Sequence, residues 1–268
     1  MAILIDASTP TVKTITGSST STASNSFSPP ANSVIFCLVA VGNLTGNTQT
    51  VTSVTDSLGS HLTWTLMNGP TDGTGANQNA RSNAQIGGGV TGATAEVWWA
   101  SCPSSQTSMT VTPTWANSSL SGGGLLGIIV FTGAATSQVG AVGLANNTAN
   151  TGTVTHAVAT TANNSWVMGI QFQWNSGTGP TAGTAQSTSF NSNSFVISPN
   201  YWAQRQNATT TTSGTSVTIN DTAPTSVSFN QVVFEVLPAS GTLNTKSVTG
   251  GASFTGAIPK QTNKLLVA

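Results

Sequence analysis

Residues 165–174 read Ser-Trp-Val-Met-Gly-Ile-Gln-Phe-Gln-Trp, and this stretch decides the fold class. Successive side chains of a β-strand point to opposite faces, so a period of two in hydrophobicity marks a strand that is buried on one side. The bulky side chains of this stretch fall on one such face, at Trp166, Met168, Ile170, Phe172 and Trp174. We therefore predict a half-buried strand here.

The same alternation recurs along the chain, at residues 62–67, 109–115 and 154–159. Clusters of Gly, Asn, Ser and Pro separate these stretches and are typical of turns. No segment combines a 3.6-residue period with capping residues, so we expect little helix. The pattern predicts an all-β fold, namely an antiparallel two-sheet sandwich of jelly-roll type.

Two apolar stretches, residues 34–41 and 125–131, do not alternate. A strand that is apolar on both sides needs cover on both sides. Long loops or a neighbouring subunit could cover the outer face, and the polarity of the loops favours the subunit. In residues 227–236 the apolar positions change phase at Asn230 and Gln231, which predicts a β-bulge at that point.

The chain is 268 residues long and carries no net charge, with charged residues making up only 4% of it. Roughly three residues in ten are Ser or Thr, so hydroxyl groups in place of charges keep the surface wet. The basic residues form no patch that would bind nucleic acid. The longest apolar run, residues 34–41, is far shorter than the roughly 20 residues of a membrane span, so we expect no membrane insertion.

The composition changes after Pro238, and we divide the chain there into a β-sandwich domain, residues 1–238, and a basic β-tail, residues 239–268. The tail holds three of the six basic residues and no acid. It is too short and too polar to fold alone, so we expect it to dock on a neighbouring subunit. The residues expected to make this assembly contact are Val248, Phe254, Ile258, Lys260, Lys264, Leu265 and Leu266.

The order of segments in residues 34–41, 52–64, 95–100, 109–112 and 129–134, closed by residues 231–238, resembles jelly-roll or immunoglobulin-like sandwich modules. Such modules recur in tail, fibre and capsid-decorating proteins of bacteriophages. The tail segment, residues 254–262, looks like repeats at the ends of phage fibre proteins. The resemblance covers most of the chain but rests on strand texture, and it brings no catalytic residue.

The resemblance implies a structural protein of a phage virion, assembled in the host cytoplasm and located in the particle. Its expected partners are further copies of itself, most naturally as a trimer, and other virion proteins. A host-surface glycan is a further candidate partner. The alternative function is a carbohydrate-binding or adhesin module of a cell-surface or secreted assembly.

Six acidic residues are available for chemistry, and none of them forms a catalytic pattern. Glu96 and Glu235 occupy similar mid-strand contexts, and we interpret them as solvent-facing residues in preference to a hydrolytic pair. His61 and His156 lie near no nucleophile turn. We therefore expect no enzyme activity and no cofactor.

Metal binding has weak support in the sequence. Two His and two Cys lack the spacing of a transition-metal site. Asp56, Asp72 and Asp221 lie near Asn residues and could offer oxygen ligands to calcium, but no known calcium-loop spacing is present, so we expect no metal.

Two aromatic pairs are the candidate binding residues. Trp98 and Trp99 must point to opposite faces of a strand, and Tyr201 with Trp202 forms a second pair. Exposed rings of this kind stack on sugars or anchor a protein partner, whereas covered rings only pack. Both readings remain open. Cys37 and Cys102 fit two buried free thiols, with a disulfide as the alternative.

Overall fold

The computed structural model describes residues 2–15, 18–43, 47–70, 77–86, 92–119, 123–138, 140–174, 179–192 and 200–240. The regular secondary structure of these residues consists of β-strands, and the ladders between the strands are antiparallel. The predicted all-β antiparallel sandwich is confirmed. Within the described residues there is also no helix that could span a membrane.

The first half of the chain forms one sandwich. Its central sheet has the order β1 (Leu4–Ile5), β11 (Gly124–Thr132), β3 (Ser33–Asn43), β9 (Gly92–Cys102) and β5 (Thr65–Leu66). Two further strands extend it, because β2 (Lys13–Ile15) pairs with β11 and β8 (Arg81–Ser82) pairs with β9. The outer layer consists of β4 (Val51–Asp56) and β10 (Val111–Trp115), and β6 (Asn68–Pro70) forms a ladder with β7 (Asn77–Asn79).

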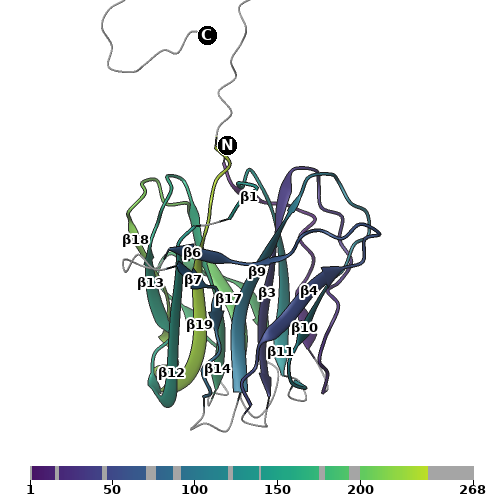
Figure 1. The fold of residues 1–268 in the computed structure, drawn as a ribbon. Helices are drawn as coiled ribbons and strands as arrows, with labels where there is room; N and C mark the ends of the chain where they lie inside the picture. The colour runs from purple at the N-terminus through teal and green to yellow at the C-terminus, as the bar shows by residue number, and fades with distance from the viewer. Residues whose placement is uncertain are drawn as a thin grey trace, which may run out of the picture.

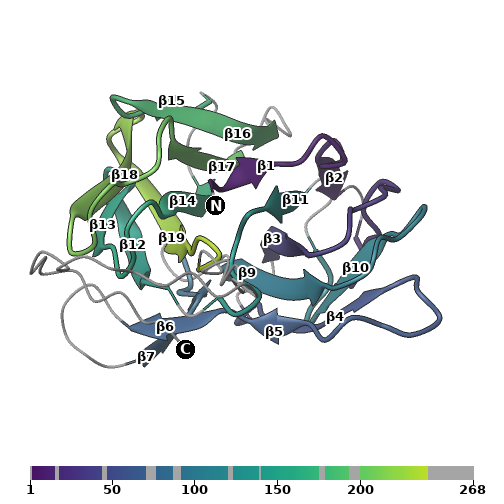
Figure 2. The same cartoon turned by 90° about the horizontal axis from the view of Figure 1, so that it is seen from above.

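The second half forms another sandwich. Its central sheet has the order β12 (Val142–Gly152), β19 (Val227–Val236), β14 (Trp166–Trp174), β17 (Asn200–Gln206) and β16 (Gln186–Ser192). Its outer layer is β13 (Thr155–Ala159), β18 (Ser216–Ala223) and β15 (Thr181–Ala182). The two central sheets lie side by side in the middle of the molecule, and the outer layers lie on either side (Figures 1 and 2).

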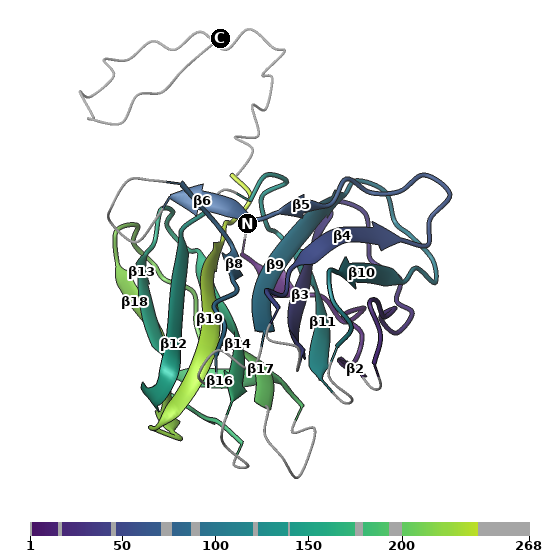
Figure 3. The same cartoon turned by 60° about the horizontal axis from the view of Figure 1, so that its bottom comes forward.

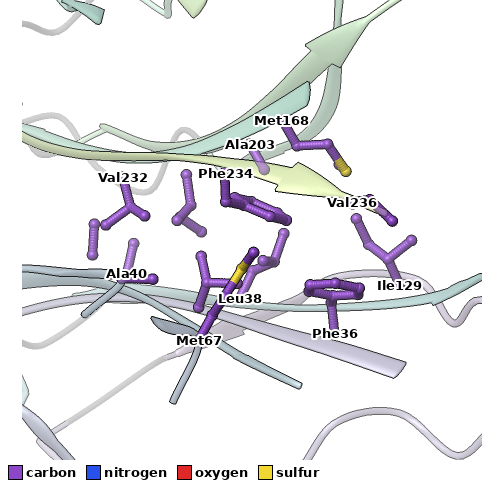
Figure 4. Close-up of a cluster of buried hydrophobic side chains, with 14 of the residues drawn as sticks. Phe36, Leu38, Ala40, Met67, Ile129, Met168, Ala203, Val232, Phe234 and Val236 are labelled. Carbon is purple, nitrogen blue, oxygen red and sulfur yellow. The ribbon is translucent and has the colours of Figure 1, made fainter. Parts of the chain in front are cut away.

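A central core fills the space between the two central sheets. Phe36 of β3 stacks on Phe234 of β19 with ring centroids 5.5 Å apart, and the edge of Phe131 meets Phe36 at 5.6 Å. Figure 4 shows side chains of both sheets pointing toward one another across this core. Aromatic pairs of this geometry add about 1 kcal/mol each to the burial of their area. The two sandwiches therefore share one apolar interior.

This arrangement explains the two stretches that do not alternate, and it corrects the prediction about their cover. All of β3 is buried, as is nearly all of β11. Leu38 and Ile129 face the central core, whereas Cys37 and Val130 face the outer core of the first sandwich. The chain itself thus supplies the cover for which a neighbouring subunit was expected. The second sandwich packs against the face of the first central sheet that a neighbouring subunit was expected to cover.

The predicted bulge at Asn230 and Gln231 is wrong. The ladder of β19 with β14 runs without a register shift from Val236 to Ser228. The apolar positions change phase because β19 has a core on each side: Val232 faces the central core and Phe229 faces a smaller cluster behind the sheet.

The second sandwich repeats the strand order of the first, an internal repeat that the sequence reading missed. In each central sheet the middle strand lies between two strands that come later in the chain. β3 lies between β9 and β11, and β14 lies between β17 and β19. In the outer layers β4 pairs with β10, and β15 pairs with β18. Residues 107–110, Thr-Ser-Met-Thr, come directly before β10, and the similar residues 215–218, Thr-Ser-Val-Thr, form the start of β18. Figure 3 shows the two halves next to each other.

Candidate functional site

The predicted aromatic residues occupy three different environments. Trp98 and Trp99 are both partly exposed and point to opposite faces of β9, as predicted. Trp98 packs against the outer core of the first sandwich and Trp99 against the central core. Tyr201 and Trp202 on β17 are fully buried.

The prediction that Tyr201 and Trp202 offer a binding surface is therefore corrected. Tyr201 lies in the central core with its ring centroid 4.8 Å from that of Phe172, and its burial raises the pKa of its hydroxyl well above the ordinary value. Trp202 lies behind the central sheet with Val154 and Phe229. Neither ring can meet a sugar or a partner while both faces of β17 are covered.

Sequence reasoning missed Trp64, which belongs with Trp98 to a partly exposed apolar cluster of the first sandwich. Trp64, Leu58, Leu62 and Trp98 are partly exposed and pack against the outer core. Leu66 of β5 lies opposite Trp98, so Trp64 lies two positions further along the same face of that edge. We call these four residues the tryptophan patch. The alternation of residues 62–67 predicted a strand, and it also indicated that Leu62, Trp64 and Leu66 share one face.

Asp56 fixes the indole of Trp64 in the tryptophan patch. It is 5% exposed, and its carboxylate accepts hydrogen bonds from the Trp64 indole Nε1 at 2.9 Å and from the main-chain N–H groups of Leu58 and Leu62 at 3.0 and 2.9 Å. His61 adds a contact at 3.2 Å through Nδ1. Burial alone would raise the pKa of Asp56, but these hydrogen bonds outweigh it and the pKa lies below the ordinary value. Because N–H donors occupy its oxygens, Asp56 is no calcium ligand.

Glu96 fixes the indole of Trp98 in the same patch. Its buried carboxylate forms an ion pair with Arg81 at 2.9 Å and accepts hydrogen bonds from the Val51 N–H at 2.7 Å and the Thr94 hydroxyl at 2.9 Å. The Trp98 indole Nε1 donates to the same carboxylate at 3.2 Å. Each indole of the patch is thus fixed to a buried acid.

The interpretation of Glu96 and Glu235 as solvent-facing residues is wrong, because both are fully buried. Glu235 accepts hydrogen bonds from the main-chain N–H groups of Ala141, Thr161 and Ala162 at 2.9 to 3.1 Å. It points behind the second central sheet, since its neighbours Phe234 and Val236 face the central core. Glu96 points behind the first central sheet, next to β4. Both sheets therefore separate the two acids, and they cannot flank one substrate bond.

The remaining candidates for metal or thiol chemistry are separate from one another. Among the described residues no three His, Cys, Asp or Glu side chains gather as a metal group. Asp72 lies outside the described residues, and so do all seven predicted assembly residues of the tail. Cys37 and Cys102 are free and buried, and burial raises the pKa of each thiol.

Comparisons with protein-family models, with curated proteins and with solved structures find no match to this chain.

Proposed function

We propose that this chain is a non-catalytic structural protein of a bacteriophage particle, of the tail, fibre or capsid-decoration type. The virion part of the proposal rests on the resemblance of the strand segments, and the non-catalytic part is supported by the use of the acids. Asp56, Glu96 and Glu235, which sit in or at the end of strands, each bind several N–H or O–H donors of the same chain. A general acid or base must instead reach a substrate proton.

The surface supports the same proposal. Within the described residues the one large apolar side chain that is exposed is Leu4, at 60%. With charged residues at only 4%, the surface presents mostly hydroxyl, amide and backbone groups. Contacts made by such a surface depend on shape and hydrogen bonds and respond weakly to salt. We assign assembly to the tail, residues 239–268, because the apolar strands of the sandwiches are already covered.

A screen for hydrolysis tests the non-catalytic half of this proposal. The purified chain is incubated with a panel of polysaccharides and peptidoglycan, and released sugar ends are measured. We expect no turnover above that of the heat-unfolded chain. Turnover by the folded chain that Glu96→Gln or Glu235→Gln abolishes would contradict the proposal.

The second candidate function is glycan binding by the tryptophan patch. The observation that favours it is the pair of partly exposed indoles whose N–H groups are fixed by Asp56 and Glu96. Rings fixed in this way lose little freedom when a flat sugar face stacks on them. This function is compatible with a virion protein that contacts a host surface.

A further inference from the structure

The interior of the second sandwich is polar where that of the first is apolar. Gln171 and Gln173 of β14, Gln204 of β17 and Gln231 of β19 are all buried. They lie on the face of the second central sheet that is turned toward β18, because the alternate residues of these strands line the central core. The strand that corresponds to β14 in the first sandwich, β3, carries apolar side chains at the middle positions of the matching face: Ile35, Cys37, Val39 and Val41.

Two of these glutamines join the central sheet to the outer layer. The Gln204 Nε2 donates to the Asn220 carbonyl at 2.9 Å, and the Gln231 Nε2 donates to the Ile219 carbonyl at 3.0 Å. Both carbonyls belong to β18. These glutamine side chains therefore connect the second central sheet to β18 by hydrogen bonds.

Asp221 is the next inward-facing residue of β18 after Val217 and Ile219, and it is 2% exposed. Its main-chain N–H donates to the Val154 carbonyl at 2.9 Å, and the side chains of Trp202 and Gln204 lie against its carboxyl group. In the first sandwich the matching position of β10 holds a buried proline, Pro113.

Four polar atoms around Asp221 lack a hydrogen bond of ordinary geometry to any described residue. They are both carboxyl oxygens of Asp221, the Trp202 Nε1 and the Gln204 Oε1. Two of these groups can only accept or only donate: the indole N–H is a donor and the amide oxygen is an acceptor. Buried polar atoms without partners are costly, so the correct protonation state is the one that pairs them.

No positive charge balances Asp221 within the described part of the chain. The ionisable groups that share its layer are His156 on β13 and Glu235 on β19, and Glu235 is held by the N–H groups of residues 141, 161 and 162. Arg205 of β17 lies on the opposite face, 4.6 Å from the centre of the Trp166 ring. A buried carboxylate without a cation is strongly unfavourable.

We propose that Asp221 is held as a neutral carboxylic acid that fastens β18 to the second central sheet, and that its ionisation at alkaline pH loosens this contact. The neutral acid has one O–H donor and one carbonyl acceptor. The O–H donates to the Gln204 Oε1, and the carbonyl accepts from the Trp202 Nε1, so all four atoms find partners. On ionisation the proton passes to solvent, and the Gln204 oxygen then faces a negative charge.

The direction of the pH effect follows from the burial of the acid. Burial raises the pKa of Asp221 to about 8, and the Trp202 N–H, which can also donate to the ionised form, has a smaller and opposite effect. In the unfolded chain an aspartic acid titrates near pH ~4. The unfolded chain therefore loses this proton first, so Asp221 makes folding less favourable as the pH rises from about 4 to about 8.

The test is the substitution Asp221→Asn, which copies the neutral acid in shape, donor and acceptor. Denaturant unfolding of both full chains is followed across this pH range. We expect the ratio of the unfolding constants, wild type over variant, to rise by up to about tenfold per pH unit. An asparagine variant that is less stable than the wild type at every pH would overturn the proposal, as would an unchanged ratio.

Asp56→Asn is the matched control, because the pKa of Asp56 is lowered in the folded protein. Its stabilising effect is present above the unfolded pKa and is lost as the pH falls, so this variant should be less stable at neutral pH. A measurement on the wild type needs no variant: infrared difference spectra between neutral and alkaline pH should show a protonated carboxyl band that disappears. The absence of a protonated carboxyl band at neutral pH, or stabilisation of the wild type by millimolar calcium that Asp221→Asn removes, would contradict a neutral acid.

Discussion

Buried acids in this protein are used in three ways that depend on their immediate surroundings. Glu96 has a guanidinium partner in Arg81, Glu235 has a set of main-chain N–H groups, and Asp221 has only neutral side chains. A charge-assisted hydrogen bond stabilises a folded protein by about 1.5 to 3 kcal/mol, so the donors around Glu96 and Glu235 offset the cost of burial in a way that the neutral side chains around Asp221 do not. Similar acid residues in strands thus have different partners.

At the same scale, the tryptophan patch leads to a prediction about glycan binding. Trp64→Ala removes an indole that lies at the surface, and Trp174→Ala is a matched control because Trp174 is a partly exposed tryptophan of the other sandwich. If the patch binds sugar, Trp64→Ala should weaken binding about tenfold or more, the equivalent of about 1.4 kcal/mol, and the control should not. Tryptophan fluorescence titrations with a glycan panel measure this. Equal affinities of wild type and Trp64→Ala would exclude the patch.

Among the elements, the two central strands begin in the same way. Asn32 precedes β3 and Asn164 lies two residues before β14, and both adopt a φ of 58° and are exposed. Each is followed by a buried serine, Ser33 or Ser165. This left-handed conformation is tolerated by Asn and Gly and costs other residues about 1 to 2 kcal/mol.

Substitutions at Asn164 test whether this turn fixes the start of β14. Asn164→Ala should lower the free energy of unfolding by about 1 kcal/mol, because alanine pays the cost of the left-handed conformation. Asn164→Gly is the control and should change it by less than about 0.5 kcal/mol. Both are measured by denaturant titration. An alanine variant as stable as the wild type would mean that the turn is not held at that φ.

How far elements could be predicted depended on where their partners lie in the chain. The alternation in residues 165–174 is local, and it located β14 correctly, but the prediction that the strand is half-buried was wrong, because Gln171 and Gln173 on its other face are buried as well. The cover of β3 is not local, because an apolar stretch looks the same whether a sister subunit or residues 130 positions later bury it. Trp202 was misplaced for a similar reason: its neighbour Gln204 reads as a surface residue until β18 is known to lie over it.

On the scale of the whole molecule, the chain consists of two sandwiches of the same strand order that press their central sheets together. Each half has an outer core of its own, apolar in the first and polar around Asp221 in the second. An alkaline shift should therefore act on the second half before the first. Because the chain covers its own apolar strands, we propose that assembly uses its polar surface and the tail.

We propose that the two sandwiches, which cover their own apolar strands, assemble through residues 239–268. The chain is attached to the first sandwich at the point where the tail begins. Pro238 forms a β-bridge with Ala134, and the Ala239 N–H donates to the Gly133 carbonyl at 2.8 Å. A chain that ends at Ser240 keeps these contacts and should remain folded.

Sedimentation velocity measures the mass of the full chain and of the chain that ends at Ser240. We expect an oligomer, a trimer in the simplest case, for the full chain and a folded monomer for the shortened one. Equal masses for the two chains, whether both are monomers or both are oligomers, would contradict it.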